Sequence, residues 1–223
     1  MLAFAANSVL NRLALADTAI DAASFTLIRL TAGALVLWAL VQRHAGGRLA
    51  GDWPGASALF VYAAAFSFAY RALSTGTGAL LLFGTVQVSM IAAGLFKGER
   101  FRPLQIAGFG VALGGLGVLL APGISAPPVD AALLMVLAGL AWAVYSLRGR
   151  HARGTPLAMT GYAIWYSALR GLTATQAATV QLSVPVIAAL GGALLLAEPL
   201  TARLALASAA TLGGIALVVT TRR

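Results

Sequence analysis

The sequence contains no cysteine and few charged residues, and each shortage excludes a class of protein. Without cysteine, neither a disulfide framework nor a thiolate metal site can form. Charged residues make up 9% of the 223 residues and hydrophobic residues 60%, which leaves too little polar surface for a protein that faces water on all sides. The period-two alternation that a membrane β-barrel needs is also absent. The composition therefore predicts an all-α, polytopic helical membrane protein.

Acidic residues are scarce as well: six Asp and Glu stand against 15 Lys and Arg, which gives a formal charge of +9. A basic balance can indicate a nucleic-acid partner. Here, however, the basic residues lie mostly in short connections between apolar segments, where they set topology and contact lipid headgroups. We therefore expect membrane lipids, and no nucleic acid, as partners.

Apolar segments separated by short polar connections predict the membrane spans. The first half of the chain shows five of them: 3–15, 22–41, 53–73, 77–96 and 103–121. The second half shows three full spans and one short or re-entrant segment: 129–147, 156–172 (the short one), 173–197 and 204–219. A linker rich in proline and glycine, 122–128, divides the chain into a first repeat, 1–121, and a second repeat, 129–223.

The two halves carry copies of one pattern, 68–120 and 164–219. Tyr70-Arg71-Ala72-Leu73 aligns with Tyr166-Ser167-Ala168-Leu169, Gly98-Glu99 with Ala197-Glu198, and Gly114-Gly115 with Gly213-Gly214. Such duplication is typical of membrane transporters. Residues 140–148 of the second half resemble residues 4–12 of the first half, so the two segments are 136 positions apart. Where Tyr166 aligns with Tyr70, the separation has fallen to 96 positions. The second half therefore lacks about forty residues, or about one span and its loop, between Arg153 and Tyr162.

Basic residues also predict topology, because cytoplasmic loops carry an excess of Lys and Arg. If 156–172 re-enters the membrane without crossing it, 11 basic residues are cytoplasmic, Arg12 and Arg203 are outside, and Arg71 lies near the outer rim. If that segment crosses, the count falls to 9 inside and rises to 4 outside. Charge therefore favours the re-entrant arrangement.

The sequence YSALRGLTATQAATVQLSVPVIAALGGALLLAEPLT, together with FKGERF in the first copy, resembles the EamA-domain exporters of the drug/metabolite transporter superfamily. The resemblance covers essentially the whole chain. It implies two inverted five-helix repeats, no cofactor, and export of amino acids, other metabolites or drugs across the bacterial inner membrane. The missing span is a departure from that family.

Polar residues inside spans are the natural candidates for a substrate pathway, because they are costly in hydrocarbon unless they face a partner or a water-filled cavity. Pro185 joins them because it frees a backbone carbonyl at the middle of a helix, at the place equivalent to Gln87. The candidates are Asn7, Asn11, Tyr70, Gln87, Ser89, Trp142, Tyr145, Trp165, Tyr166, Gln181 and Pro185. For each Tyr, Trp and Gln, the alternative is packing or hydrogen bonding between helices.

Arg29 is the basic residue that lies well inside a predicted span. One hypothesis makes it an anchor for a substrate carboxylate. The alternative is a snorkelling or paired structural arginine about a turn from the loop that bears Asp21.

Glu99 and Glu198 occupy equivalent helix ends, beside Arg100 and Pro199, and local capping and pairing explain them better than proton coupling. No Asp or Glu lies at the middle of a predicted span, so no carboxylate proton relay is visible. Gly110-x-x-x-Gly114 and Gly94-x-x-x-Gly98 predict close helix packing within the bundle, with homodimerisation as a weaker alternative.

Three classes of function can be compared. The first is a secondary transporter that exports a small metabolite, amino-acid-like or drug-like, by alternating access. The second is an intramembrane enzyme, which the sequence disfavours because His44 and His151 lie in basic loops and no mid-span nucleophile–base pair or metal constellation exists. The third is a transport-incompetent remnant of a transporter that has lost one span.

Overall fold

The computed structural model describes residues 2–44, 53–96, 98, 102–123, 126–149 and 183–220. These residues form α-helices joined by turns, without a strand, so the predicted all-α class is confirmed. The helices are α1 (Leu2–Asp17), α2 (Ala22–His44), α3 (Trp53–Ala69), α4 (Thr75–Phe96), α5 (Pro103–Leu120), α6 (Val129–Gly149), α9 (Ser183–Leu196) and α10 (Ala202–Thr220). The predicted segment 156–172 and the first part of 173–197 lie outside the described residues.

Five of the described helices, α2, α4, α5, α6 and α10, are long and apolar enough to cross a membrane. The shortest of them, α5, has 18 residues. At about 1.5 Å per residue it extends for about 27 Å, close to the thickness of the hydrocarbon core. Helices α1, α3 and α9 are shorter and also apolar. The chain is thus a polytopic helical membrane protein, as its composition predicts.

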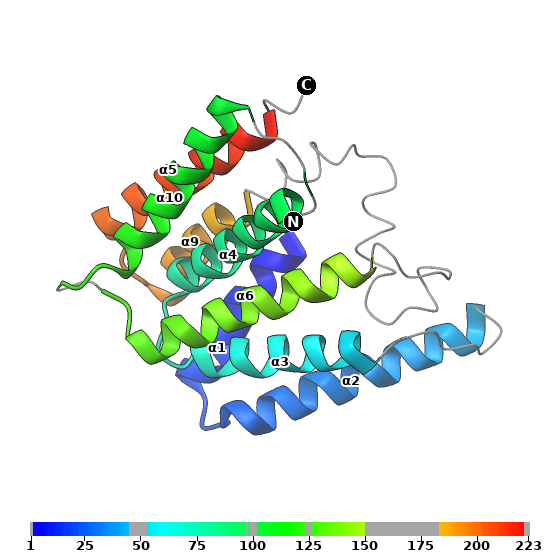
Figure 1. Ribbon diagram of the computed structural model, residues 1–223. Coiled ribbons are helices and arrows are strands. Elements are labelled where there is room, and N and C mark those ends of the chain that lie inside the picture. The colour runs from blue at the N-terminus through cyan, green and yellow to red at the C-terminus, as the bar shows by residue number, and fades with distance from the viewer. Residues whose placement is uncertain are drawn as a thin grey trace.

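Helix α4 lies at the centre of the bundle and contacts α1, α5, α6, α9 and α10 (Figure 1). It is also the most buried of the five long helices. On one side, α6 packs against α3, and α2 contacts the bundle mainly through α3. On the other side, α5 and α10 form a tightly packed pair. The central position of α4 explains why its 22 residues contain no charged side chain.

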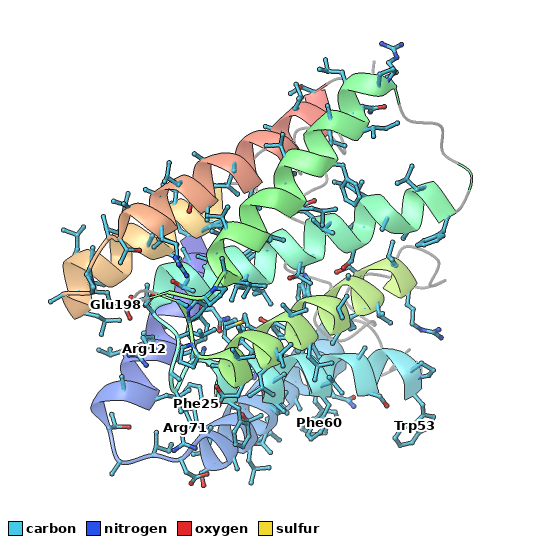
Figure 2. All side chains as sticks on the ribbon, turned by 60° about the vertical axis from the view of Figure 1, so that its left-hand side comes forward. Arg12, Phe25, Trp53, Phe60, Arg71 and Glu198 are labelled. Atoms are coloured by element: carbon cyan, nitrogen blue, oxygen red, sulfur yellow. The ribbon has the colours of Figure 1, made fainter. Side chains whose placement is uncertain are left out.

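Successive helices run in opposite directions, so the bundle has two ends (Figure 1). At one end, α1, α3, α5 and α9 finish and α2, α4, α6 and α10 begin; we call this the Glu198 end. At the other end, α2, α4, α6 and α10 finish and α5 begins after Arg102, so we call it the Arg102 end. Figure 2 shows Arg71 and Glu198 at one end, and Trp53 at the opposite end of α3.

Polar side chains fix where helices begin at the Glu198 end. Asp21 Oδ1 accepts hydrogen bonds from the N–H groups of Ala23 and Ser24, both at 2.9 Å. Thr201 Oγ1 accepts one from the N–H of Leu204 at 3.1 Å. The first N–H groups of a helix have no partner within it, so such caps satisfy donors that would otherwise be orphaned. The two caps therefore mark the residues at which α2 and α10 begin, which the apolar sequence that follows does not mark.

Helices α5 and α10 pack through reciprocal contacts. A Cβ atom on Gly115 would lie 2.6 Å from the backbone N of Thr211, and one on Gly214 would lie 2.6 Å from the backbone N of Ala112. In the sequence alignment of the two copies, Gly115 corresponds to Gly214 and Ala112 to Thr211. A two-fold relation between α5 and α10 would produce this exchange of partners. The domain boundaries themselves stay a prediction.

The prediction that Gly110 and Gly114 are packing positions within the bundle is not confirmed in the part of the chain that the structure describes. There, no atom lies within 4 Å of where their Cβ atoms would be, nor of the Cβ position at the equivalent Gly213. At 3.6 residues per turn, Gly108 and Gly115 face α10, while Gly110 and Gly114 lie on the other side of α5. Because α5 is apolar all round, its sequence does not show which glycines face a partner.

Candidate substrate pathway

Two predicted pathway residues, Asn7 and Asn11, and the predicted anion anchor Arg29 form one hydrogen-bonded chain between α1 and α2. Arg29 Nη1 donates to Asn11 Oδ1 at 2.9 Å. Asn11 Nδ2 donates to the backbone O of Asn7 at 2.7 Å and to Asn7 Oδ1 at 3.2 Å. The two asparagines are four residues apart on α1, so they lie on the same face of the helix. The chain brings a cation and two amides together inside the apolar part of the bundle.

Helix α3 supplies the other side of the Arg29 environment. The Arg29 guanidinium lies 5.4 Å from the ring centroid of Phe66, within the range of a cation–π contact, and Nη2 donates to the backbone O of Ala63 at 3.5 Å. Tyr62 lies one turn before Phe66 on α3, and the two rings are 5.4 Å apart. Arg29 is thus partly buried against α1 and α3 rather than extended towards an aqueous phase.

Arg29 does not pair with Asp21, and both hypotheses for it, the anchor and the paired structural arginine, stay predictions. The Asp21 carboxylate caps α2. Among the described residues, the salt bridge is formed by a different pair, Arg12 and Glu198. The partners of Arg29 in this part of the chain are neutral groups: an amide oxygen, a carbonyl and an aromatic face. A guanidinium has five N–H donors, so it retains donors for a further acceptor.

Aromatic side chains form a wall beside the polar chain. Trp142 of α6 lies 4.8 Å from Tyr62, 5.5 Å from Tyr145 and 6.1 Å from Phe4, measured between ring centroids. The Tyr62 and Phe66 rings are 5.4 Å apart, and so connect the wall to the aromatic face under Arg29. Trp142 and Tyr145, both predicted from the sequence, therefore join the same region as the Arg29 chain.

Sequence reasoning missed Tyr62, Phe66 and Phe4. A signal for two of them exists: Tyr62, Phe66 and Tyr70 recur every four residues along α3 and the turn after it, which places them on one face. Their exposed fractions are 8%, 0% and 0%, so this face points into the bundle. In an apolar span, however, lipid-facing aromatic residues look the same in sequence.

Other predicted residues lie elsewhere in the structure. The Tyr70 hydroxyl donates to the backbone O of Thr75 at 3.3 Å, so this buried side chain closes the turn between α3 and α4. The Ser89 hydroxyl donates to the Thr85 carbonyl of its own helix at 2.7 Å. Gln87 and Pro185 are buried in α4 and α9. Trp165, Tyr166 and Gln181 lie outside the described residues.

At the Glu198 end, a second polar cluster joins parts of the chain that are far apart in sequence. Arg12 Nε and Glu198 Oε1 form a salt bridge at 3.2 Å. Arg12 Nη1 also donates to the backbone O atoms of Tyr70 and Arg71, both at 3.0 Å, and Glu198 Oε2 accepts from the N–H of Thr75 at 2.7 Å. The predicted role of Glu198 as a helix cap holds, but it caps α4 rather than its own neighbours. Figure 2 shows Arg12 and Glu198 side by side.

Comparisons with known proteins agree with this architecture. Residues 154–220 match the EamA-like transporter family. An uncharacterized protein of Pseudomonas aeruginosa is 52% identical over 266 residues, which cover 100% of this chain and 92% of the relative. That alignment has about forty more positions than this chain has residues, which agrees with the deficit inferred from the two halves. A crystal structure with 21% identity, aligned over 99% of this chain and 98% of its own, has a TM-score of 0.58 and so shares the fold. The chain belongs to the EamA-like transporter family.

Proposed function

We propose that this protein is a secondary transporter that exports a small metabolite, amino-acid-like or drug-like, across the bacterial inner membrane by alternating access. The observation that carries the proposal is the Arg29–Asn11–Asn7 chain inside a bundle of membrane-spanning helices. Polar groups at that depth are costly unless they are paired or face a water-filled cavity, and Arg29 keeps N–H donors that a polar solute could use. Membership of a transporter family supplies the second support.

The chemistry around Arg29 favours a substrate with an anionic group and an apolar body. Free guanidinium donors bind a carboxylate well because their planar fork matches its two oxygens. Beside them, the rings of Tyr62, Phe66 and Trp142 offer apolar surface with a few polar edges. Amino-acid-like solutes combine both features.

A transport-incompetent remnant is the second candidate, and one observation favours it. The relative in Pseudomonas aeruginosa has about forty residues that this chain lacks, enough for about one span and its loop. Loss of one span from one repeat would remove part of the pathway wall. The two candidates differ in whether the purified, folded protein moves any solute.

Efflux from proteoliposomes separates them. The purified chain is reconstituted, each of the twenty standard amino acids is loaded in radiolabelled form, and release is compared with protein-free vesicles. We expect at least one amino acid to leave faster through the wild type, and Arg29→Gln to reduce that rate by about tenfold or more. Arg43→Gln, an exposed arginine at the far end of α2, is the matched control and should leave the rate unchanged. Absence of efflux for all twenty from a monodisperse protein would favour the remnant.

A further inference from the structure

The Arg12–Glu198 cluster closes one end of the bundle, and its parts come from both halves of the chain. Arg12 lies on α1, the carbonyls of residues 70 and 71 lie in the turn between α3 and α4, and Glu198 lies between α9 and α10. The two charged residues are 186 positions apart. These contacts are tertiary, so local helix propensity does not explain them. Because each bond joins two different elements, it can break without unfolding either element.

We propose that Arg12 and Glu198, with the Thr75 N–H and the carbonyls of residues 70 and 71, form a latch that closes the outer mouth of the transport pathway and opens once in each transport cycle. The inference rests on the proposed transport function, and it assigns a gate that the Arg29 site does not itself provide. The Glu198 end faces outward because most basic connections lie at the Arg102 end.

The position of Glu198 suits a movable part. It lies in the short non-helical link between α9 and α10, directly after Ala197, whose φ is +51°. Positive φ is strained for a residue with a Cβ atom, so this link is held in place by its surroundings. The Glu198 carboxylate is one of those surroundings, because its two oxygens bind Arg12 and the start of α4. Breaking these bonds would free the link without disturbing the helices on either side.

Water can replace the latch contacts, which makes opening feasible. The side chains of Arg12 and Glu198 are 22% and 13% exposed, so the pair lies at the boundary between bundle and solvent rather than in a dry core. Next to it, Thr75 Oγ1 is buried and has no hydrogen-bond partner among the described residues. A buried hydroxyl without a partner is disfavoured, and hydration on opening would satisfy it.

By contrast, the α5–α10 contact is suited to remain fixed. Backbone atoms of α5 meet backbone atoms of α10 around Gly115 and Gly214, and Gln105 Nε2 donates to the Val218 carbonyl at 3.2 Å. Such close packing leaves no room for sliding. Helix α9 is also closely packed, because a Cβ atom on Gly76 would lie 2.7 Å from the Cβ of Ala189. Opening at the latch would therefore move Glu198 and the α9–α10 link away from Arg12 and Thr75, while α5 and α10 stay together.

Thiol labelling tests the latch without a substrate, so its failure is distinguishable from failure of the transport proposal. The chain has no cysteine, so Ser8→Cys introduces a single thiol. Ser8 is 1% exposed and lies one turn from Arg12 on the inward face of α1. A membrane-impermeant maleimide is applied from outside to right-side-out vesicles. We expect Glu198→Gln or Arg12→Gln to raise the labelling rate about tenfold, which corresponds to about 1.4 kcal/mol in the closed–open equilibrium.

The control removes a charge at the same end outside the latch: Asp130→Asn at the start of α6. It should leave labelling at the background rate. Equal labelling in latch and control variants, with all of them monodisperse in detergent, would overturn the proposal. Increased labelling from the cytoplasmic face alone would overturn it as well, because it would place the gate at the other end.

Crosslinking provides the second measurement in case single neutralisations impair folding. In Arg12→Cys/Glu198→Cys, a reducible bifunctional thiol reagent ties α1 to the α9–α10 link. Ala5→Cys adds a third thiol on the buried face of α1. Reduction of the crosslink with a phosphine also releases two thiols at positions 12 and 198, so the phosphine is removed and labelling is followed at position 5 alone, by mass spectrometry of its peptide. We expect position 5 to stay unlabelled from outside while the crosslink is intact and to become labelled after reduction. Labelling that is indifferent to the crosslink, or loss of folded protein in all latch variants, would assign the pair a purely structural role.

Discussion

Gly98 and Ala197 share a left-handed backbone conformation, with φ of +85° and +51°. They are aligned in the two copies of the sequence pattern, and each follows the end of a helix, α4 and α9 respectively. The Gly98 N–H donates to the Leu95 carbonyl at 2.9 Å, and the N–H after Ala197 donates to the Gly192 carbonyl at 3.1 Å. Left-handed residues commonly end helices in this way, and glycine is preferred there. The second copy therefore has a Cβ atom where the first has none.

Replacing Ala197 by glycine should stabilise the protein. The substitution removes the steric penalty of a left-handed non-glycine residue, which is about 1 to 2 kcal/mol, although glycine also gains freedom in the unfolded chain. We expect a net gain of about 0.5 to 1 kcal/mol, seen as a higher midpoint in thermal unfolding of the detergent-solubilised protein. Gly98→Ala is the reciprocal variant and should lower the midpoint. A midpoint that falls for Ala197→Gly would contradict this account of the link.

Gly214→Ala should destabilise the α5–α10 pair, because the new Cβ atom would meet the carbonyl O of Gly108 and the backbone N of Ala112. Backbone atoms in packed helices move little, so the expected loss is about 1 to 3 kcal/mol. The neighbouring Gly213→Ala is a matched control: no atom of the described residues lies within 4 Å of its Cβ position, and helix propensity favours alanine. Thermal unfolding of both variants tests the packing. Equal midpoints would show that α5 and α10 do not approach as described.

The bundle was predictable from sequence, but the faces of its helices were not. Spans could be predicted because stretches such as 77–96 carry no charge, and their described helices begin and end within a few residues of the predicted positions. Amphipathic patterning, which shows the inward face of a soluble helix, is absent when lipid and neighbouring helices are equally apolar. That is why Gly110 and Gly114 were assigned to packing while Gly108 and Gly115 perform it.

Part of the candidate site could also be predicted from the sequence, and part could not. Arg29, Asn7 and Asn11 were predicted because polarity inside a span is conspicuous, and they meet in one chain. Glu198 was expected to cap and pair locally; its actual partner, Arg12, is 186 residues away, a distance that only tertiary structure reveals. The carboxylate of Glu198 indicated capping and pairing, but only the structure identifies Arg12 as its partner.

Acid should weaken the start of α2 through Asp21. Hydrogen bonds from the Ser24 side chain and from backbone N–H groups hold the pKa of Asp21 below its usual value of about 3.9. The cap is therefore fully formed above that value, and its contribution is lost as pH falls through the lowered folded-state pKa. We expect the difference in unfolding midpoint between wild type and Asp21→Ala to be constant from pH 7 to pH 5 and to shrink below about pH 4.

Asp21→Asn distinguishes the charge from the cap itself. An asparagine side chain still accepts N–H hydrogen bonds at this position, but it does not titrate. The difference between Asp21→Asn and Asp21→Ala should consequently stay constant over the same pH range. If that difference also shrinks in acid, another group is responsible for the pH dependence.

The C-terminus should lie in the cytoplasm. Helix α10 runs antiparallel to α5, because Arg203 near its start donates to the Ala121 carbonyl, while Val218 near its end accepts from Gln105. Its last residues therefore lie at the Arg102 end, where α6 also finishes and α9 begins (Figure 1). That end carries the connections with Arg43, Arg102 and Arg148, and an excess of basic residues marks the cytoplasmic side. A reporter pair fused after residue 223, alkaline phosphatase and green fluorescent protein, should give fluorescence without phosphatase activity. Phosphatase activity would place α10 in the opposite orientation, and with it the latch on the cytoplasmic face.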